Sequence, residues 1–565
     1  MNERLLAMKQ RVRDGEHRRF RRTEPIKILD ECERERLSWM QRAARLTVRQ
    51  CEAESPVLLP DERIVFTRTL PAIIPALYTS EDYARITAGR TLHELGPISN
   101  IAADWGQTLA QGLEGRKAAA SAQLQRCQND PQAVEFLTCV VETLDAVLAL
   151  AGRYREAALD LGLEDIAEML NRVPALPPRT FREALQSLRL VQAVVWLSGN
   201  YHVGLGRFDQ YMWPYLQADL EDGRLNGNEA EDLLAEFFIA LNKDSDLYPG
   251  VQQGDNGQTI TLGGIDRAGQ DAVNPLTYMV LRVSRDLAMI DPKVNLRISP
   301  RTSLDLLSLA TELTRKGLGF PQYSNDDVVI PGLVAHGYRL EDAREYAVAA
   351  CWEFLIPGRG MDVVNIGAVS FPAAVDHALR AGLPSGDDMT GILKRVGEDI
   401  RLQVASLAGA YETLLLAPAP YYSSLMTDCL ERGQDLSRGA EYNNFGIHGA
   451  GSANAADALA AVEQFVFRDG SVSTADLLAA MDADFEGHEV LCQKLAAQAP
   501  KVGNDDPRAD RFMTCLFDQL ADACETYGRT SRGGILRPGS GSAMYYIWLA
   551  QGHAGMREPV VGATA

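Results

Sequence analysis

The chain has 565 residues, of which 46% are hydrophobic and 23% charged, and its formal net charge is −20. This composition is ordinary for a globular protein with a large core, and the acidic charge disfavours an extended phosphate backbone, so we expect no nucleic-acid partner. No apolar run of about 18 residues and no apolar signal core occur, so we expect no membrane association. Nine irregularly spaced cysteines without a C-x-x-C pair indicate a reduced, cytoplasmic protein without a metal site or a disulfide framework.

The first 200 residues have apolar residues at helical spacing, and Pro-rich breaks separate the helices. The predicted helices span residues 5–13, 28–51, 133–161 and 181–197. From about residue 257 the pattern changes to strand–helix alternation. Strands are predicted at 258–263, 293–298 and 319–323, helices at 275–288, 303–316 and 326–336, and residues 344–350 lead into Cys351. This alternation predicts an α/β fold, with a barrel as one candidate, under a helical N-terminal layer.

The stretch AVAACWEFLIPGRGMD, residues 347–362, combines a thiol and a carboxyl group at the end of an apolar strand. A lone cysteine in such surroundings is usually core filler. Glu353 fits that interpretation poorly, because a carboxylate beside a buried strand end needs a partner or a proton. The alternative is that Cys351 and Glu353 form a redox or acid–base pair, since loops at strand ends carry the chemistry of α/β folds.

Five longer stretches are distinctive: GLGRFDQYMWPYL (204–216), TITLGGIDRAGQDAVNPLTYMVL (259–281), GFPQYSNDDVVIPGLVAHGYRLEDAREYAVAACWEF (319–354), GIHGAGSANAADALAAV (446–462) and APKVGNDDPRAD (499–510). These stretches resemble the pyruvate formate-lyase-like family of glycyl radical enzymes. The resemblance covers residues 180–565 strongly and the helical N-terminus weakly. The family implies a ten-stranded β/α barrel of two half-barrels surrounded by helices, with a helical N-terminal layer over residues 1–180 and the core over 181–565. It also implies a homodimer.

The resemblance implies a role for the Cys-x-Glu sequence. Cys351 matches the cysteine that becomes a thiyl radical and abstracts hydrogen from the substrate, so its thiol should be dry and tightly held. Glu353 resembles the general base of the family's eliminases, and burial should raise the pKa of its carboxyl group. Trp352 stands where pyruvate formate-lyase itself has a second cysteine, which disfavours the two-cysteine acyl transfer.

Tyr201 and Asp209 match positions that line the substrate pocket of the eliminases. The alternatives are that Asp209 forms a structural ion pair with Arg207 and that Tyr201 is a core ring. His202 is interpreted as a packed or capping histidine, and His448 as a support for its Gly-rich loop.

Asn365 stands fourteen residues after the cysteine, where the family's eliminases usually have an Asp. An amide can hydrogen-bond a substrate hydroxyl or carboxylate but cannot transfer a proton. We therefore assign Asn365 to substrate binding, and simple diol dehydration is disfavoured.

The family continues beyond the position that corresponds to residue 565 into a loop that carries the radical glycine. No residue of the chain can be assigned as that glycine, since residues 282–285 read Arg-Val-Ser-Arg on a predicted helix and Gly337-Tyr338 lacks the preceding Arg-Val. A split gene, a truncation and a catalytically inactive paralogue all remain open, and the retained site residues favour the first two. The resemblance then implies no directly bound cofactor. A glycine-bearing C-terminal domain or subunit would supply the glycyl radical in trans, after installation by a radical S-adenosylmethionine activase.

The leading hypothesis is the cysteine-bearing core of a glycyl radical lyase that cleaves a C–O, C–N, C–S or C–C bond of a small metabolite. The alternative is an inactive paralogue that acts as a binding or scaffold protein. A nucleotide-binding enzyme or a serine hydrolase is disfavoured, because GxxxxGK[ST] and GxSxG are absent and no GxGxxG follows a strand.

Overall fold

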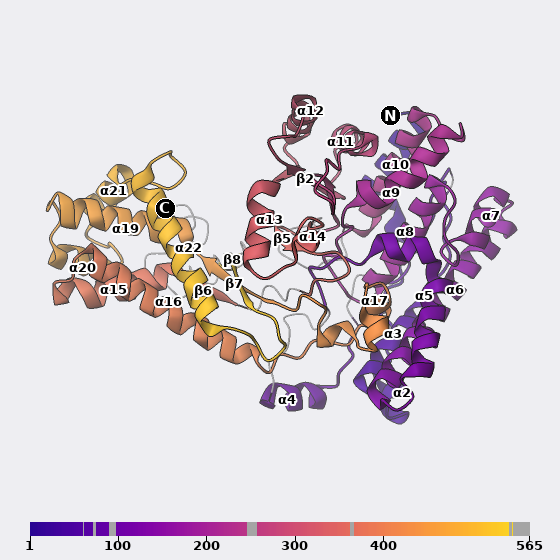
Figure 1. Ribbon diagram of the computed structural model, residues 1–565, viewed down its shortest axis with the longest axis horizontal. Coiled ribbons are helices and arrows are strands. Elements are labelled where there is room, and N and C mark those ends of the chain that lie inside the picture. Colours follow the sequence, from indigo (N-terminus) through magenta and orange to yellow (C-terminus); the bar gives the residue numbers. More distant parts are fainter. Residues whose placement is uncertain are drawn as a thin grey trace. The chain divides into compact units, whose positions relative to one another are not determined.

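The computed structural model describes residues 1–59, 61–71, 75–89, 98–245, 257–361, 367–541 and 545. The chain divides into two compact units, and each is described by itself (Figure 1). Unit 1 comprises Met1–Asp362 and Leu415–Tyr442, and unit 2 comprises Val363–Leu414 and Asn443–Ala565. The division into residues 1–180 and 181–565 follows a different line and stays a prediction.

Unit 1 begins with a helical region in which α6 packs against α3, α5 and α7. Polar caps start several helices: the Ser38 hydroxyl accepts from Gln41 N at the start of α3, and Asp130 accepts from the first turn of α6, which begins at Pro131. The helices are α1 (Glu3–Arg13), α2 (Leu29–Arg34), α3 (Trp39–Ala53), α4 (Ser80–Gly89), α5 (Trp105–Arg126), α6 (Pro131–Asp160), α7 (Glu164–Arg172), α8 (Phe181–Leu197), α9 (Phe208–Glu221) and α10 (Gly227–Leu241).

The second part of unit 1 alternates strands and helices, as the sequence predicts. Its elements are β1 (Thr259–Gly263), α11 (Pro275–Leu287), β2 (Lys293–Ile298), α12 (Leu304–Thr314), β3 (Gln322–Asn325), α13 (Asp326–Ala335), α14 (Leu340–Ala343), β4 (Ala347–Ala349), β5 (Glu353–Leu355), α17 (Pro420–Ser424) and α18 (Cys429–Arg432). Short 3-10 helices lie at Glu16–Phe20, Asn242–Asp244 and Leu436–Arg438.

Two predicted elements of unit 1 are wrong in their bounds. The helix predicted over residues 28–51 is two helices, because Arg36 adopts a left-handed φ of 56° and Ser38 caps a new helix. The strand predicted at 319–323 starts later, at Gln322, since Gly319 has a φ of 81° that is incompatible with an extended strand.

The main sheet of unit 1 is parallel, with the strand order β1-β2-β3. Thr261 pairs with Asn295, and Arg297 pairs with Ser324. Isolated parallel bridges add two more extended segments, because Gly206 pairs with Ile260 and Gly204 pairs with Ala102. Five extended segments therefore run in the same direction, in the chain order that parallel α/β connections favour.

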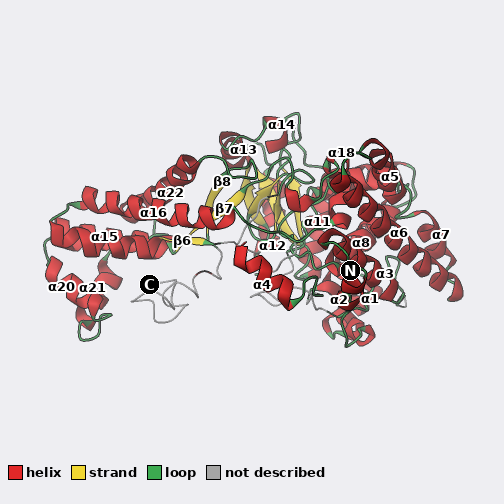
Figure 2. Ribbon diagram, turned by 90° about the horizontal axis from the view of Figure 1, so that it is seen from below, coloured by secondary structure: helices red, strands yellow, loops and turns green. Residues whose placement is uncertain are grey.

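Unit 2 contains a second parallel sheet, with the order β6-β7-β8, and Figure 2 shows its long helices α15 and α16 side by side. Helix α22 packs against α16 and α19. The elements are β6 (Ala368–Ser370), α15 (Phe371–Ser385), α16 (Met389–Tyr411), β7 (Phe445–Ala450), α19 (Ser452–Val462), a π-helix (Glu463–Arg468), α20 (Thr474–Asp482), α21 (Glu489–Gln498), α22 (Pro507–Tyr527) and β8 (Leu536–Ser540).

The predicted α/β fold is confirmed, whereas the closed ten-stranded barrel is not found among the described residues. These residues form two three-stranded parallel sheets and the β4-β5 hairpin instead. In the described part of the chain, no helix is long and apolar enough to cross a membrane. Within the same residues, no group of three or more His, Cys, Asp or Glu side chains could hold a metal ion.

Candidate active site

Cys351 lies at the tip of the antiparallel hairpin formed by β4 and β5, in which Ala349 pairs with Glu353. The loop between the strands is Ala350-Cys351-Trp352, and Ala350 has a left-handed φ of 50°. Such a backbone angle is unfavourable for a residue with a Cβ and persists only where the surroundings hold it. The predicted position of Cys351 at a strand end is thus confirmed, and the strand end is a tight turn.

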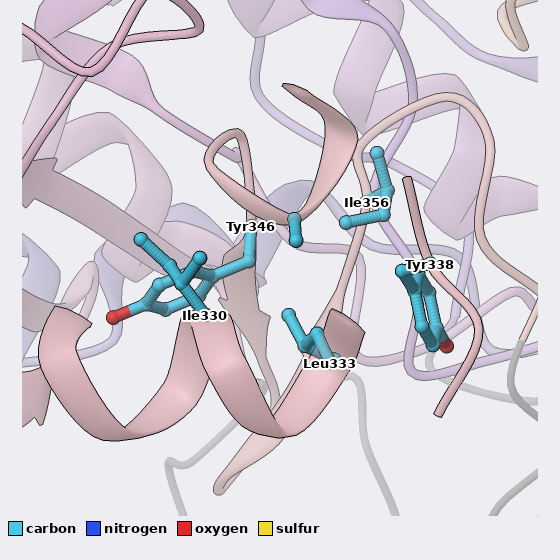
Figure 3. Packing of buried hydrophobic residues seen from close by; sticks show 6 residues of the cluster. Ile330, Leu333, Tyr338, Tyr346 and Ile356 are labelled. Carbon is cyan, nitrogen blue, oxygen red and sulfur yellow. The ribbon is translucent and has the colours of Figure 1, made fainter. Parts of the chain in front are cut away.

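An apolar cluster fixes the base of this hairpin (Figure 3). Ile330 and Leu333 of α13 pack with Tyr346, which precedes β4, and Ile356, which follows β5. The partly buried Phe354 of β5 packs against the same cluster. Burial of these side chains holds both ends of the hairpin on α13, so the tip is presented from a rigid support.

A buried ionic network reinforces the base of the hairpin. The guanidinium of Arg297 in β2 donates to Asp326 Oδ1 and Oδ2 at 2.8 and 3.0 Å, and it lies 4.1 Å from the centre of the Tyr346 ring. The Tyr346 hydroxyl donates to Asp326 Oδ1 at 2.8 Å. Because Arg297 is fully buried, this bidentate pairing compensates for the loss of water around its charge.

The tip of the hairpin lies against the amino end of β1. Val348 N donates to Thr261 Oγ1 at 3.0 Å, and Thr259 Oγ1 donates to the Ala350 carbonyl at 3.1 Å. Gly257 sits behind the turn, where a Cβ would come within 3.0 Å of Ala350 Cα. Only glycine fits at this point, which also has a φ of 64°.

Cys351 is exposed, and the same is true of Trp352, a residue that is 49% accessible. All nine cysteines belong to the described residues, and none forms a disulfide. The exposure of Cys351 differs from the expectation of a dry thiol, since the residue lies in the loop between β4 and β5. The hairpin therefore holds Cys351 in place but does not itself exclude water.

Glu353 folds back onto the cysteine turn. Its Oε2 atom accepts hydrogen bonds from Cys351 N at 2.7 Å and from Trp352 N at 2.9 Å. Burial of the carboxyl group raises its pKa above the usual value, and the backbone N–H groups and the more distant Lys293 oppose that rise in part. The predicted direction of the pKa shift is confirmed, and the carboxyl group contacts the turn that carries the thiol.

Tyr201 and His202 lie at the amino end of the extended segment that pairs with β1. Their rings pack edge to face with centroids 5.0 Å apart, and both side chains are buried. His202 Nδ1 lies 2.7 Å from Asn100 Oδ1, and the His202 ring approaches Gly257 beside the cysteine turn. The description of His202 as a packed histidine agrees with these contacts, and its place next to the turn was not expected.

Asp209 lies at the opposite end of β1 from the cysteine turn. Its fully buried Oδ2 accepts from Gly263 N at 2.8 Å and from Thr277 Oγ1 at 2.6 Å, so it connects α9 to the carboxyl end of β1 and to α11. Burial raises the pKa of Asp209. The alternative that Asp209 forms an ion pair with Arg207 is wrong, because Arg207 forms its ion pair with Glu345 at 3.0 Å.

The structure thus brings Cys351, Glu353, His202 and its neighbour Tyr201 to the amino edge of the sheet but does not bring Asp209 there. Along β1, the Asp209 contact at Gly263 is four residues from Thr259, or about 13 Å. Asn365 lies outside the described residues, so its role stays a prediction, as do the substrate contacts of Tyr201 and Asp209. Sequence reasoning missed Thr259, which carries no motif of its own and is recognised only from its bond to Ala350.

His448 lies in β7 of unit 2 and is described there by itself. Its ring packs edge to face against Tyr545 with centroids 5.9 Å apart, and burial lowers its pKa to about 4. A neutral, buried ring at this position is consistent with a supporting role for its Gly-rich strand.

Known proteins similar to this chain were found in three comparisons. A family model described as "Pyruvate formate lyase-like" matches residues 67–412 and 410–549. A (2S)-3-sulfopropanediol dehydratase of Klebsiella oxytoca is 28% identical over 493 residues, which are 79% of this chain and 59% of that protein. A trans-4-hydroxy-L-proline dehydratase of Clostridioides difficile is 30% identical over 421 residues, 66% of this chain and 52% of that protein. The chain therefore spans about half to three fifths of the length of these relatives.

Among solved structures, the glycerol-bound form of the B12-independent glycerol dehydratase from Clostridium butyricum matches with a TM-score of 0.81 at 22% identity. The match covers 99% of this chain and 83% of that one. At this identity the likeness shows a shared fold over nearly the whole chain.

Proposed function

Because the chain belongs to the pyruvate formate lyase-like family of glycyl radical enzymes, we propose that it is the cysteine-bearing core of a lyase for a small metabolite. The bond cleaved would be C–O, C–N, C–S or C–C. One observation carries this proposal: the Cys351 thiol sits at the tip of a braced hairpin, and the Glu353 carboxylate is bonded to the same turn. A hydrogen-atom acceptor and a base are thereby held within two residues of each other.

In the proposed reaction the glycyl radical, when present, supplies the oxidation of the Cys351 thiol to a thiyl radical. Cys351 then takes a hydrogen atom from a substrate carbon that bears a hydroxyl group, so an S–H bond forms and a C–H bond breaks. Glu353 accepts the hydroxyl proton, and the leaving group departs from the neighbouring carbon with its electron pair. The product radical takes the hydrogen atom back from Cys351. Burial raises the pKa of Glu353, which makes its carboxylate a stronger base.

The substrate would lie at the amino edge of the unit 1 sheet, beside Tyr201 and His202. Both rings are buried there and offer an apolar wall with polar edges. We also assign Asn365 to substrate binding, through hydrogen bonds of its amide to a hydroxyl or carboxylate. Asp209 is the weakest of the proposed substrate contacts, because its carboxylate already accepts three internal hydrogen bonds.

The radical would come from a glycine-bearing C-terminal domain or subunit, after installation by a radical S-adenosylmethionine activase. A glycine-bearing segment of that domain or subunit could approach the cysteine turn, because Cys351 and Trp352 are exposed.

The test is anaerobic activation with an activase, S-adenosylmethionine and a reductant. Residues 1–565 alone should give no glycyl signal in electron paramagnetic resonance, and adding a glycine-bearing C-terminal fragment should restore signal and turnover.

Cys351→Ser should keep the signal and abolish turnover, because an O–H bond is too strong for the glycyl radical to break readily. Glu353→Gln should lose at least about tenfold in rate, the order of magnitude that a general base supplies.

Full turnover by Cys351→Ser would refute the proposed function. A signal without turnover in the unsubstituted chain, over a panel of hydroxylated metabolites, would favour the inactive paralogue instead.

A further inference from the structure

The cysteine turn has three backbone polar groups that side chains hold directly. The N–H groups of Cys351 and Trp352 converge on one atom, Glu353 Oε2, at 2.7 and 2.9 Å. The carbonyl of Ala350 accepts from Thr259 Oγ1 at 3.1 Å. No other described residue donates to Glu353 Oε1. The two oxygens of one carboxylate therefore have different surroundings.

The turn needs such support, because Ala350 is in the left-handed region with a φ of 50°. That conformation costs about 1–2 kcal/mol for a residue with a Cβ. Bonds from N–H groups to an ionised carboxylate are roughly twice as strong as bonds to a neutral acceptor. Two hydrogen bonds to one carboxyl oxygen favour this shape of the turn while the Cys351 and Trp352 side chains face solvent.

We propose that Glu353 has a second task besides proton transfer: its Oε2 atom holds the turn that presents the Cys351 sulfur. The proposal rests on the proposed function for the use of the thiol, but the positioning itself needs no radical. Oε1 is then the atom that meets the substrate hydroxyl. Thr259 is a further positioning residue, since its hydroxyl holds the other side of the same turn.

Two variants of Glu353 should therefore distinguish proton transfer from the positioning of the cysteine turn. Glu353→Gln removes the charge and the base but keeps an amide oxygen that can accept both N–H groups. Glu353→Ala removes the base and the acceptor together. Both variants lose the same charge, so any difference between them at the turn reports the acceptor and not the charge.

The experiment measures amide hydrogen exchange by mass spectrometry in the unactivated chain, on peptides that cover residues 347–356. Glu353→Ala should speed the exchange of two amides by on the order of tenfold or more, and Glu353→Gln should stay within about threefold of the unsubstituted chain. Glu345→Ala is the matched control, because Glu345 lies on the same segment, pairs with Arg207 and does not contact the turn. It should leave these two amides unchanged.

A second readout is alkylation of Cys351 by iodoacetamide, with the exposed Cys492 as internal reference. The ratio of the Cys351 rate to the Cys492 rate should differ between Glu353→Ala and Glu353→Gln. In Glu353→Gln, Cys351 should be alkylated at a single, uniform rate. If Glu353→Ala does not fold, Glu353→Asp replaces it, since its shorter side chain keeps the charge but moves the oxygen away from the turn.

Equal exchange in the Ala (or Asp) and Gln variants would overturn the positioning role. That result is independent of the proposed function, because it requires no activase and no turnover. Conversely, full turnover by Cys351→Ser would refute the proposed function and leave the exchange result standing.

Discussion

The two parallel sheets of the molecule differ in whether particular buried polar groups have hydrogen-bond or ionic partners. In unit 1, several buried polar groups on or beside the sheet are paired: Arg297 binds Asp326, Asn295 Nδ2 donates to Ser324 Oγ at 2.8 Å, and Thr277 donates to Asp209. In unit 2, β7 buries His448 with no hydrogen-bond partner for Nδ1 among the described residues. These three groups of the first sheet are compensated by partners, whereas burial keeps His448 of the second sheet neutral.

This difference predicts which perturbation each sheet is sensitive to. Removing a partner leaves an uncompensated buried group, so the unit 1 sheet should be sensitive to substitution. A buried neutral histidine resists protonation, so the unit 2 sheet should be sensitive to acid. The cysteine turn belongs to neither case, because its Cys351 and Trp352 side chains are exposed.

The largest effect is expected for Asp326→Ala. It leaves the fully buried Arg297 unpaired and removes the acceptor of Tyr346, so the free energy of unfolding should fall by about 3–5 kcal/mol. Tryptophan fluorescence in a urea titration would measure it, since Trp39, Trp105, Trp196 and Trp213 report on unit 1. Asp327→Ala, an exposed neighbour on α13, should cost less than about 1 kcal/mol. Equal losses in the two variants would mean that the ionic network does not hold the sheet.

Thr277→Val should come next, with a loss of about 2–3 kcal/mol, because it removes a hydroxyl that donates to a buried carboxylate at 2.6 Å. Thr277→Ser keeps the hydroxyl and should lose less than half of that. The same urea titration measures both variants. If Val and Ser behave alike, the cost is one of packing and not of hydrogen bonding.

The pH response of unit 2 should be smaller. The pKa of His448 is lowered from 6.5 to about 4, so the unfolded chain binds the proton more tightly and stability is lost as the pH falls. Stability is unaffected above pH 6.5 and falls as the pH drops from 6.5 toward about 4, and the loss at pH 5 amounts to about 2 kcal/mol. Hydrogen exchange of residues 445–450, corrected for intrinsic rates, should show this decline between pH 7 and 5.

His448→Gln should lack this part of the pH response, because an amide does not titrate in this range. The two chains should therefore converge in protection of β7 as the pH falls. Parallel curves for the two chains would show that His448 is not the titrating group.

The smallest effect is expected at the cysteine turn. Trp352→Ala should change the free energy of unfolding by about 0.5 kcal/mol, since the side chain is half exposed and its ring contact with Phe354 is at 6.4 Å. Thermal unfolding followed by circular dichroism would check it. A loss as large as that of Thr277→Val would place the turn among the elements that hold the sheet.

Local sequence signals predicted many elements of this protein closely. The helix at 181–197 and the strand at 293–298 have the predicted bounds, because the Thr180 cap and the alternation of apolar residues are local features. The place of Cys351 at a strand end and the raised pKa of Glu353 also followed from neighbouring residues. Where a backbone angle interrupts the pattern, as at Arg36, periodicity alone could not find the break.

The sequence by itself determined the α/β alternation, the family and the pairing of a thiol with a carboxyl group two residues away. Only the tertiary structure decided that the cysteine turn lies at the amino end of β1, near His202 and Thr259, and that Asp209 lies at the other end. The reason is physical: helix caps and strand alternation depend on residues within a few positions, whereas strand pairing and the edge at which a side chain lies depend on hydrogen bonds between residues about 50–100 positions apart.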